Sequence, residues 1–158
     1  METTQNTPRD LFRILKIMYT AILIGNIFYI AYSYISVKQL GQTFISNKMI
    51  IQYLWFASLL ITMVMIPAAY FLYKKKIENA PIKMTLVEKL IFYRAPFFIK
   101  LAILEACCFI NATFYLITGN IYILGATAIV LIVLVINFPG KSAVSNDLKL
   151  NFEESERL

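Results

Sequence analysis

The chain contains no histidine among its 158 residues. Because imidazole is the ligand or the base in each case, this absence excludes histidine-ligated haem, imidazole-bound zinc, Ser-His or Cys-His nucleophiles and histidine proton relays. The sequence also has no recognisable catalytic, nucleotide-binding or metal-binding motif. We therefore expect a protein that is not an enzyme and that carries no cofactor and no metal.

Cysteine is nearly as scarce, since only Cys107 and Cys108 are present. The two residues are adjacent and lie in an apolar segment, so they cannot join distant elements through a disulfide. A buried thiol behaves as a small hydrophobic side chain and is chemically inert, which disfavours a redox role. We expect both cysteines to pack at a helix interface.

Charge is also sparse, with 15% charged residues against 59% hydrophobic residues and a mean hydropathy of +0.69. These values lie far outside the usual range of a soluble domain. A bilayer core of roughly 30 Å requires about 20 apolar residues in helical form, and four stretches approach that length. The predicted fold is an all-α integral membrane protein, in which four transmembrane helices form a single domain over residues 1–158.

The predicted spans cover about 11–36, 49–73, 96–118 and 121–138, and a polar tail follows at 139–158. The first apolar run is longer than a signal-peptide core and lacks a convincing cleavage site, so we interpret it as a retained span. Thr118-Gly119-Asn120 is a tight-turn signal, which makes the third and fourth spans a close hairpin. Pro139 and Gly140 end the last span.

A capping-box pattern precedes the third span, because Thr85 is followed three residues later by Glu88. The pattern predicts a short amphipathic helix between spans two and three, which ends near Arg94 and lies flat on the cytoplasmic membrane surface. The alternative is a helical turn that leads directly into the third span. Pro96 suits the first turn of that span, where no backbone donor is missed.

Basic residues flank the spans unevenly, since only Lys38 and Lys48 of the 15 lysines and arginines fall beside the first loop. The others precede the first span, flank the segment between spans two and three, or follow the fourth span. By the positive-inside rule both termini face the cytoplasm. We therefore predict a multi-pass membrane protein, and we attribute the net charge of +6 to topology rather than to nucleic-acid binding.

Glu105 is the most unusual residue, because it lies inside the third apolar stretch. If Lys100 extends back to the interface, Glu105 lies roughly 7 to 8 Å deeper at 1.5 Å per residue. A charge at that depth is costly, so the carboxyl group must pair, find water or stay protonated. Ala102, Cys108 and Ala112 share its helical stripe and allow another helix to approach closely.

Two roles for Glu105 remain open from the sequence. It could be structural, with a hydrogen bond to Tyr19, to Thr20 or to the Met63 carbonyl that Pro67 frees. It could instead titrate and carry a proton or bind a cation, with Asn26 and Asn111 continuing a polar path outward. The candidate proton, cation or packing site comprises Glu105, Lys100, Tyr19, Thr20, Met63, Pro67, Asn26 and Asn111.

The tail allows two interpretations. Leu148, Leu150 and Phe152 alternate with polar residues, a pattern that can form a strand against a partner. A disordered tail is the alternative.

Three segments carry a resemblance: the run Lys100-Leu-Ala-Ile-Leu-Glu105, the run Tyr115-Leu-Ile-Thr-Gly-Asn120, and Phe138-Pro139 with the acidic, Leu-rich tail. In these the chain resembles small uncharacterised four-span inner-membrane proteins of Bacteroidota, a resemblance that implies no activity. In size it is also similar to small multidrug transporters, but their glutamate lies in the first span. Proteolipid subunits of rotary ATPases are rich in glycine, and this chain has five glycines.

The leading functional hypothesis is a non-enzymatic inner-membrane protein that acts as a small subunit, stabiliser or assembly partner of a larger membrane complex. The scarcity of external loops and the aliphatic fourth span favour it. Its expected partners are the lipid bilayer and either other membrane subunits or a second copy, with no nucleic acid. The alternative is a proton- or cation-coupled small transporter, oligomeric, that uses Glu105.

Overall fold

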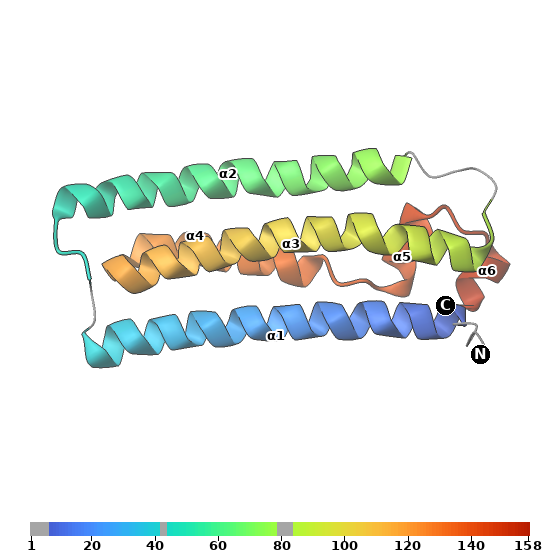
Figure 1. Cartoon of the computed structure of the whole chain (residues 1–158), viewed down its shortest axis with the longest axis horizontal. Coiled ribbons are helices and arrows are strands. Elements are labelled where there is room, and N and C mark those ends of the chain that lie inside the picture. The colour runs from blue at the N-terminus through green and yellow to red at the C-terminus, as the bar shows by residue number, and fades with distance from the viewer. Residues whose placement is uncertain (1–6, 42–43, 79–83) are drawn as a thin grey trace, which may run out of the picture.

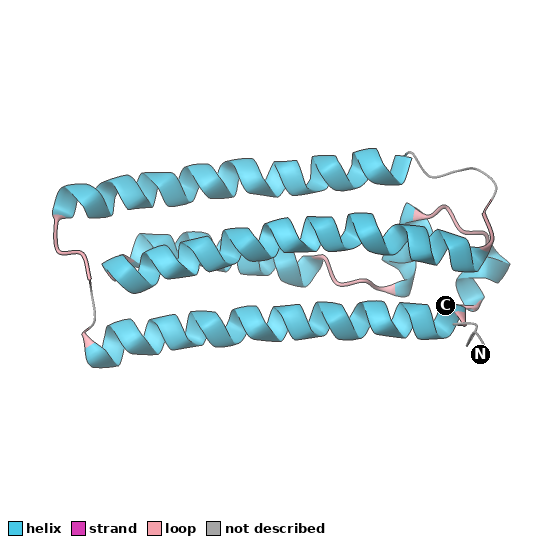
Figure 2. Cartoon of the chain, viewed as in Figure 1, coloured by secondary structure: helices cyan, strands magenta, loops and turns pink. Residues whose placement is uncertain are grey.

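The computed structural model describes residues 7–41, 44–78 and 84–158, and every regular element in these ranges is helical (Figures 1 and 2). The four long helices are α1 (Pro8–Leu40), α2 (Lys48–Glu78), α3 (Leu86–Thr118) and α4 (Ile121–Ile136). Two short helices follow, α5 (Lys141–Asp147) and α6 (Phe152–Glu156). The prediction of an all-α chain is confirmed for these residues.

Three helices, α1, α2 and α3, are each long and apolar enough to cross a membrane. Helix α4 has only 16 residues, and it meets the same criterion only together with α5, to which it is joined at a bend of 81°. The structure thus has three such helices, or four if this bent pair is one span, which indicates a multi-pass membrane protein. Helices α1, α2 and α3 extend beyond the predicted span limits, whereas α4 ends at Ile136, before its predicted limit near 138.

Helix α3 lies at the centre of the bundle, between α1 and α2 and in front of α4, and it contacts all three (Figure 1). Helices α1 and α2 are held apart by α3 rather than packed on each other. One seam of buried residues explains this position, because steps of three and four keep it on one side of the helix. The seam consists of Leu90, Tyr93, Phe97, Leu101, Leu104, Cys108, Asn111, Tyr115 and Thr118.

The expected separate amphipathic helix between spans two and three is not present, because its residues form the first turns of α3. The predicted cap itself is confirmed: the Thr85 amide donates to Glu88 Oε2 at 2.8 Å. Leu90 and Tyr93 continue the buried seam in register with Phe97. Packing along this seam outweighs the backbone hydrogen bond that Pro96 removes inside the helix.

The predicted turn between the third and fourth spans is confirmed. Gly119 ends α3 with a φ of 65°, a left-handed conformation that glycine adopts without steric cost. Asn120 then caps α4, since its side chain accepts a hydrogen bond from the Tyr122 amide at 2.9 Å. Nearby, the amides of Phe44 and Ile45 both donate to the Ile117 carbonyl, at 3.0 and 3.1 Å. The turn and the first loop are therefore joined at one end of the bundle.

The sequence suggested either a strand or a disordered tail, and both interpretations are wrong. The tail folds into α5 and α6, at the end of the bundle where α1 begins (Figure 1). Leu148 and Leu150 both pack against the core, through a turn at Lys149 with a φ of 48° rather than through strand alternation. Phe152 points away and is 79% exposed.

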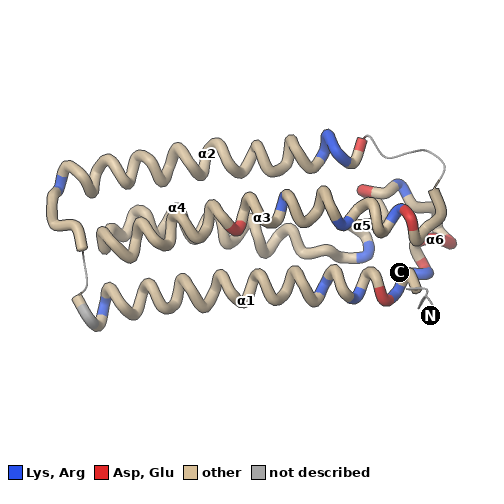
Figure 3. The backbone as a smooth tube through the Cα atoms, viewed as in Figure 1, with Lys and Arg blue, Asp and Glu red and all other residues tan. Residues whose placement is uncertain are grey.

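An ion pair fastens this tail to α3. Lys89 Nζ donates to both carboxylate oxygens of Glu154, at 2.8 and 3.0 Å. The hydrogen bond from Lys89 holds the pKa of Glu154 below its ordinary value. Charged side chains in general gather toward this end of the bundle (Figure 3).

Candidate functional site

Glu105 lies on the one side of α3 that no other helix covers. Because α1, α2 and α4 occupy the other sides, an exposed stripe remains along α3 at helical spacing. We call this stripe the open face of α3 and define it as Ile91, Ala95, Ala102, Glu105 and Ala106; Glu105 is partly exposed and the other four are exposed. Three of the five residues are alanine, so the side chains around the carboxyl group are short and allow another helix to approach closely.

No hydrogen bond or ion pair joins Glu105 to any residue within 7–41, 44–78 and 84–158. Lys100 does not reach it, because five residues along a helix turn the side chain by about 140°. The Lys100 ammonium instead lies 4.0 Å from the ring centroid of Tyr73 and 5.3 Å from that of Phe97. Lys100 is only 6% exposed, so it is a buried residue.

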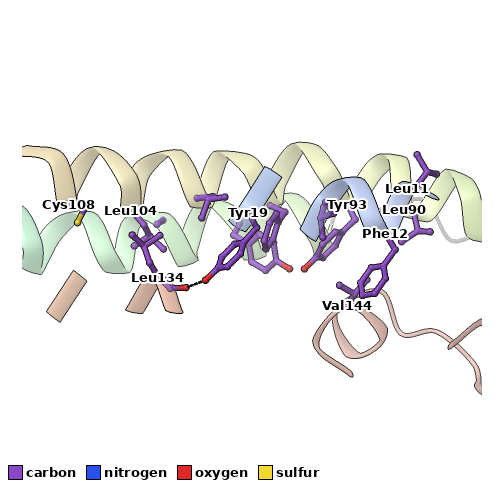
Figure 4. Packing of buried hydrophobic residues seen from close by; sticks show 14 of the residues in the cluster. Leu11, Phe12, Tyr19, Leu90, Tyr93, Leu104, Cys108, Leu134 and Val144 are labelled. Carbon is purple, nitrogen blue, oxygen red and sulfur yellow. Dashed lines mark hydrogen bonds between the residues drawn. The ribbon is translucent and has the colours of Figure 1, made fainter. Parts of the chain in front are cut away.

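Tyr19 serves another element. Its hydroxyl donates to the carbonyl of Leu134 near the end of α4 (Figure 4) and lies 3.4 Å from the carbonyl of Val135. The last carbonyls of a helix lack intrahelical partners, so Tyr19 satisfies an end of α4. Its neighbour Thr20 is exposed. Neither residue is a partner of Glu105.

The defect at Pro67 is also remote from Glu105. Helix α2 continues through Pro67, and both Pro67 and Met63 lie on its exposed side, with Met63 77% exposed. In the part of the chain that the structure describes, Glu105 donates no hydrogen bond to the Met63 carbonyl. The expected structural contact is therefore not formed here.

Asn111 is a structural residue between α2 and α3. Its Oδ1 accepts from Ser58 Oγ and its Nδ2 donates to Thr62 Oγ1, both at 2.8 Å. Cys107 Sγ lies 4.0 Å from Thr62 Oγ1 on α2, as an interface position predicts for that cysteine. Ser58 and Thr62 were not predicted as part of this site. They are four residues apart and so share one face of α2, as Cys107 and Asn111 share one face of α3.

Asn26 is separate from this network. It lies on α1, is 1% exposed and donates from Nδ2 to its own helix at the Ile22 carbonyl, 2.9 Å away. Its Oδ1 has no hydrogen-bond partner among the described residues. Since Asn111 bonds toward α2, the two asparagines do not form one polar path with Glu105.

The site thus consists of one unpaired carboxyl group on a low, apolar face. No group of three or more Cys, Asp or Glu side chains able to hold a metal ion occurs in the described ranges. Comparison of the chain with models of known families, with curated proteins and with solved structures gave no match. The resemblance to four-span proteins of Bacteroidota stays a prediction.

Proposed function

We propose that this chain is a non-enzymatic subunit or assembly partner of a larger complex in the bacterial inner membrane. The observation that carries the proposal is the position of Glu105 on the open face of α3. A carboxyl group that faces hydrocarbon costs several kcal/mol even when some water reaches it. A partner helix that covers the face removes this cost by supplying a hydrogen bond.

The neighbouring residues support the same conclusion. Ala95, Ala102 and Ala106 allow a second backbone to come close, and close packing is the main source of helix association in lipid. The interior polar groups of Asn111 are already bonded within the chain. Among the described residues, Glu105 is therefore a carboxyl group on α3 that no other group of the chain pairs with.

The orientation proposed is that of the basic residues, with both termini in the cytoplasm. The start of α1 and the end of the chain lie at the same end of the bundle (Figure 1), and the lysines at the end of α2 lie there too. A complex would then meet the docked tail on the cytoplasmic side and the open face of α3 within the membrane.

Proton- or cation-coupled transport through Glu105, in an oligomer, is the second candidate function. The absence of any partner for Glu105 in the described residues favours it, because an unpaired carboxyl group is free to titrate. The separation of Asn26 and Asn111 disfavours it, since no polar path leads from Glu105 through this chain alone.

Photo-crosslinking tests the proposal. A photoreactive amino acid replaces Ala106 on the open face in the full chain, expressed at its natural level; the control replaces Met63, which is exposed on α2. We expect one defined adduct with another membrane protein from position 106 and no adduct from position 63. Equal labelling from both positions, or only lipid adducts from 106, would contradict the proposal. An adduct between two copies would instead support the oligomeric transporter.

A further inference from the structure

A cavity of about 430 Å³ lies toward the charged end of the bundle, on a different side of α3 from the open face. Its walls come from α2, the first half of α3, the end of α4 and α5, so it exists only because the tail is folded. Its volume is within the range of small-molecule sites. The sequence analysis did not find it, because α5 was not predicted.

The Lys100 ammonium projects into this cavity without a charged partner. It lies 4.0 Å from the centroid of the Tyr73 ring and 5.5 Å from that of Tyr70, so aromatic faces stabilise part of its charge. An ammonium group nevertheless carries three N–H donors. Among residues 7–41, 44–78 and 84–158 none accepts a hydrogen bond from it and none forms an ion pair with it. The cavity therefore holds a buried cation with unmet hydrogen-bonding capacity.

The acidic residue in the cavity wall, Asp147, acts on the charge of Lys100 from beyond ion-pair distance, and two tyrosines hold its carboxylate. Asp147 Oδ2 accepts from the Tyr73 hydroxyl at 2.5 Å and from the Tyr93 hydroxyl at 3.2 Å. Lys74 also lines the cavity, so the wall has two lysines against one aspartate. The hydroxyl of Tyr70 accepts from Asn137 Nδ2 at 2.5 Å, which leaves its own hydrogen to donate. The free donors and the excess positive charge favour an anion.

The surroundings of the cavity are apolar. Ile136 in its wall is 73% exposed, Phe138 is 47% exposed, and Phe71 on α2 next to Tyr70 is 66% exposed. The same end of the bundle carries most of the charged side chains (Figure 3), which places it at the level of lipid headgroups if the apolar helices span the bilayer. A ligand with an anionic head and apolar chains fits both parts. Basic pockets between transmembrane helices are known to bind such headgroups.

We propose that this cavity binds the phosphate group of an anionic glycerophospholipid. Lys100 provides the charged contact and the Tyr70 hydroxyl a second donor, while the acyl chains lie along the exposed apolar side chains of α2 and α4. The proposal requires a membrane-embedded chain but does not depend on Glu105 or on a partner protein.

The test measures lipid binding to the purified full chain in detergent by native mass spectrometry. Phosphatidylglycerol is titrated against phosphatidylcholine of the same acyl chains, and inorganic phosphate and glycerol phosphate are added as competitors. We expect one phosphatidylglycerol per chain, bound more tightly than phosphatidylcholine and not displaced by either soluble phosphate. A hydrogen bond to a charged group lowers a dissociation constant by a factor of about ten or more. Lys100→Met should therefore raise the dissociation constant for phosphatidylglycerol about tenfold.

The matched control is Lys76→Met, which removes the same charge from an exposed position outside the cavity and should leave binding unchanged. Tyr70→Phe keeps the ring and removes one donor, so it should weaken binding a few-fold and serves if Lys100→Met does not fold. Equal binding of the two lipids, or equal losses in Lys100→Met and Lys76→Met, would overturn the proposal. Displacement by inorganic phosphate would show that the site takes a soluble anion and would overturn the lipid assignment.

Discussion

Different side chains hold together the two halves of the bundle. We call the half in which α1 begins and the chain ends the terminal half, and the half with the α1–α2 and α3–α4 connections the loop half. In the terminal half the buried residues are large, as Phe12, Tyr19 and Tyr93 illustrate (Figure 4), and Phe97 is a further example. In the loop half many are small or polar, and the list there includes Asn26, Ser33, Ser36, Ser58, Thr62, Asn111, Ala112, Ala126 and Thr127.

The difference indicates how each half is stabilised. Large side chains at the terminal end build a core that also receives Val144 and Leu158 from the tail. Small side chains in the loop half allow close contact between helices. Asn111 forms hydrogen bonds with Ser58 and Thr62 between α3 and α2. Asn26, Ser33 and Thr127 bond instead to carbonyls of their own helices. Substitutions in the two halves should therefore have effects of different size.

The largest effect is expected in the terminal half, from Phe97→Ala. Phe97 is 1% exposed and contacts Tyr19 and Tyr93, so its removal leaves a cavity. We expect a loss of about 3 kcal/mol in the free energy of unfolding, measured by denaturation in mixed micelles. Phe71→Ala is the matched control, because Phe71 is 66% exposed and its loss should have little effect. Equal losses would mean that the core does not lie where Figure 4 shows it.

A smaller effect is expected in the loop half, from Asn111→Ala. The substitution leaves Ser58 and Thr62 without their shared partner, and hydrogen bonds between membrane helices are worth about 1 kcal/mol. The same micelle experiment should give a loss of about 1–2 kcal/mol. Combination with Thr62→Val should then add less than the sum of the single changes. Full additivity would contradict a common network.

The ion pair of the tail should contribute less than about 1 kcal/mol, because both side chains are partly exposed. The pKa of folded Glu154 is below its ordinary value near 4.5, so its contribution is present above that pH. It is lost as the pH falls through the lower folded value. The protection of amides in 141–156 against hydrogen exchange, corrected for the slower intrinsic exchange at low pH, should fall at acid pH, and Glu154→Gln should lower that protection already at pH 7. An unchanged neutral-pH rate in that variant would exclude the ion pair as a fastening.

The smallest effect on the isolated fold is expected from Glu105→Gln, since Glu105 has no partner within the described chain. Unfolding in micelles should change by less than about 0.5 kcal/mol. An amide can still donate a hydrogen bond, so a subunit should keep its complex, as judged by native mass after gentle extraction. Loss of coupled uptake with the complex intact would instead favour the transporter hypothesis.

Much of the fold was predictable from the sequence, because helices in lipid must satisfy their own backbone groups and therefore follow hydropathy closely. Gly119 and the Thr85 cap were predictable for local reasons. The sequence left open whether the helix that Thr85 caps continues through Pro96 into the third span, because this depends on Leu90 and Tyr93 packing against residues far away in the sequence. The tail was missed for the same reason, because Leu148 and Leu150 are buried only through the turn at Lys149.

The candidate site was predicted less well than the fold. The sequence singled out Glu105 as an unusual residue, but a prediction of its partners required both the depth and the helical direction of each side chain. The Lys100 side chain leaves α3 in a different direction from Glu105 and lies against Tyr73. Met63 lies on the exposed side of α2. The polar network of Asn111 depends on which helices are neighbours, information that a single sequence does not contain.

The central place of α3 also bears on how the protein is made. When α1 and α2 have been inserted into the membrane and α3 has not yet been synthesised, these two helices have no packed interface with each other. The amides of Phe44 and Ile45 then have no hydrogen bond to the Ile117 carbonyl, because Ile117 does not yet exist. The pair α1 and α2 is therefore not stably packed until α3 inserts between the two helices. A nascent chain that stalls before α3 would leave two unassembled helices for membrane quality control to recognise.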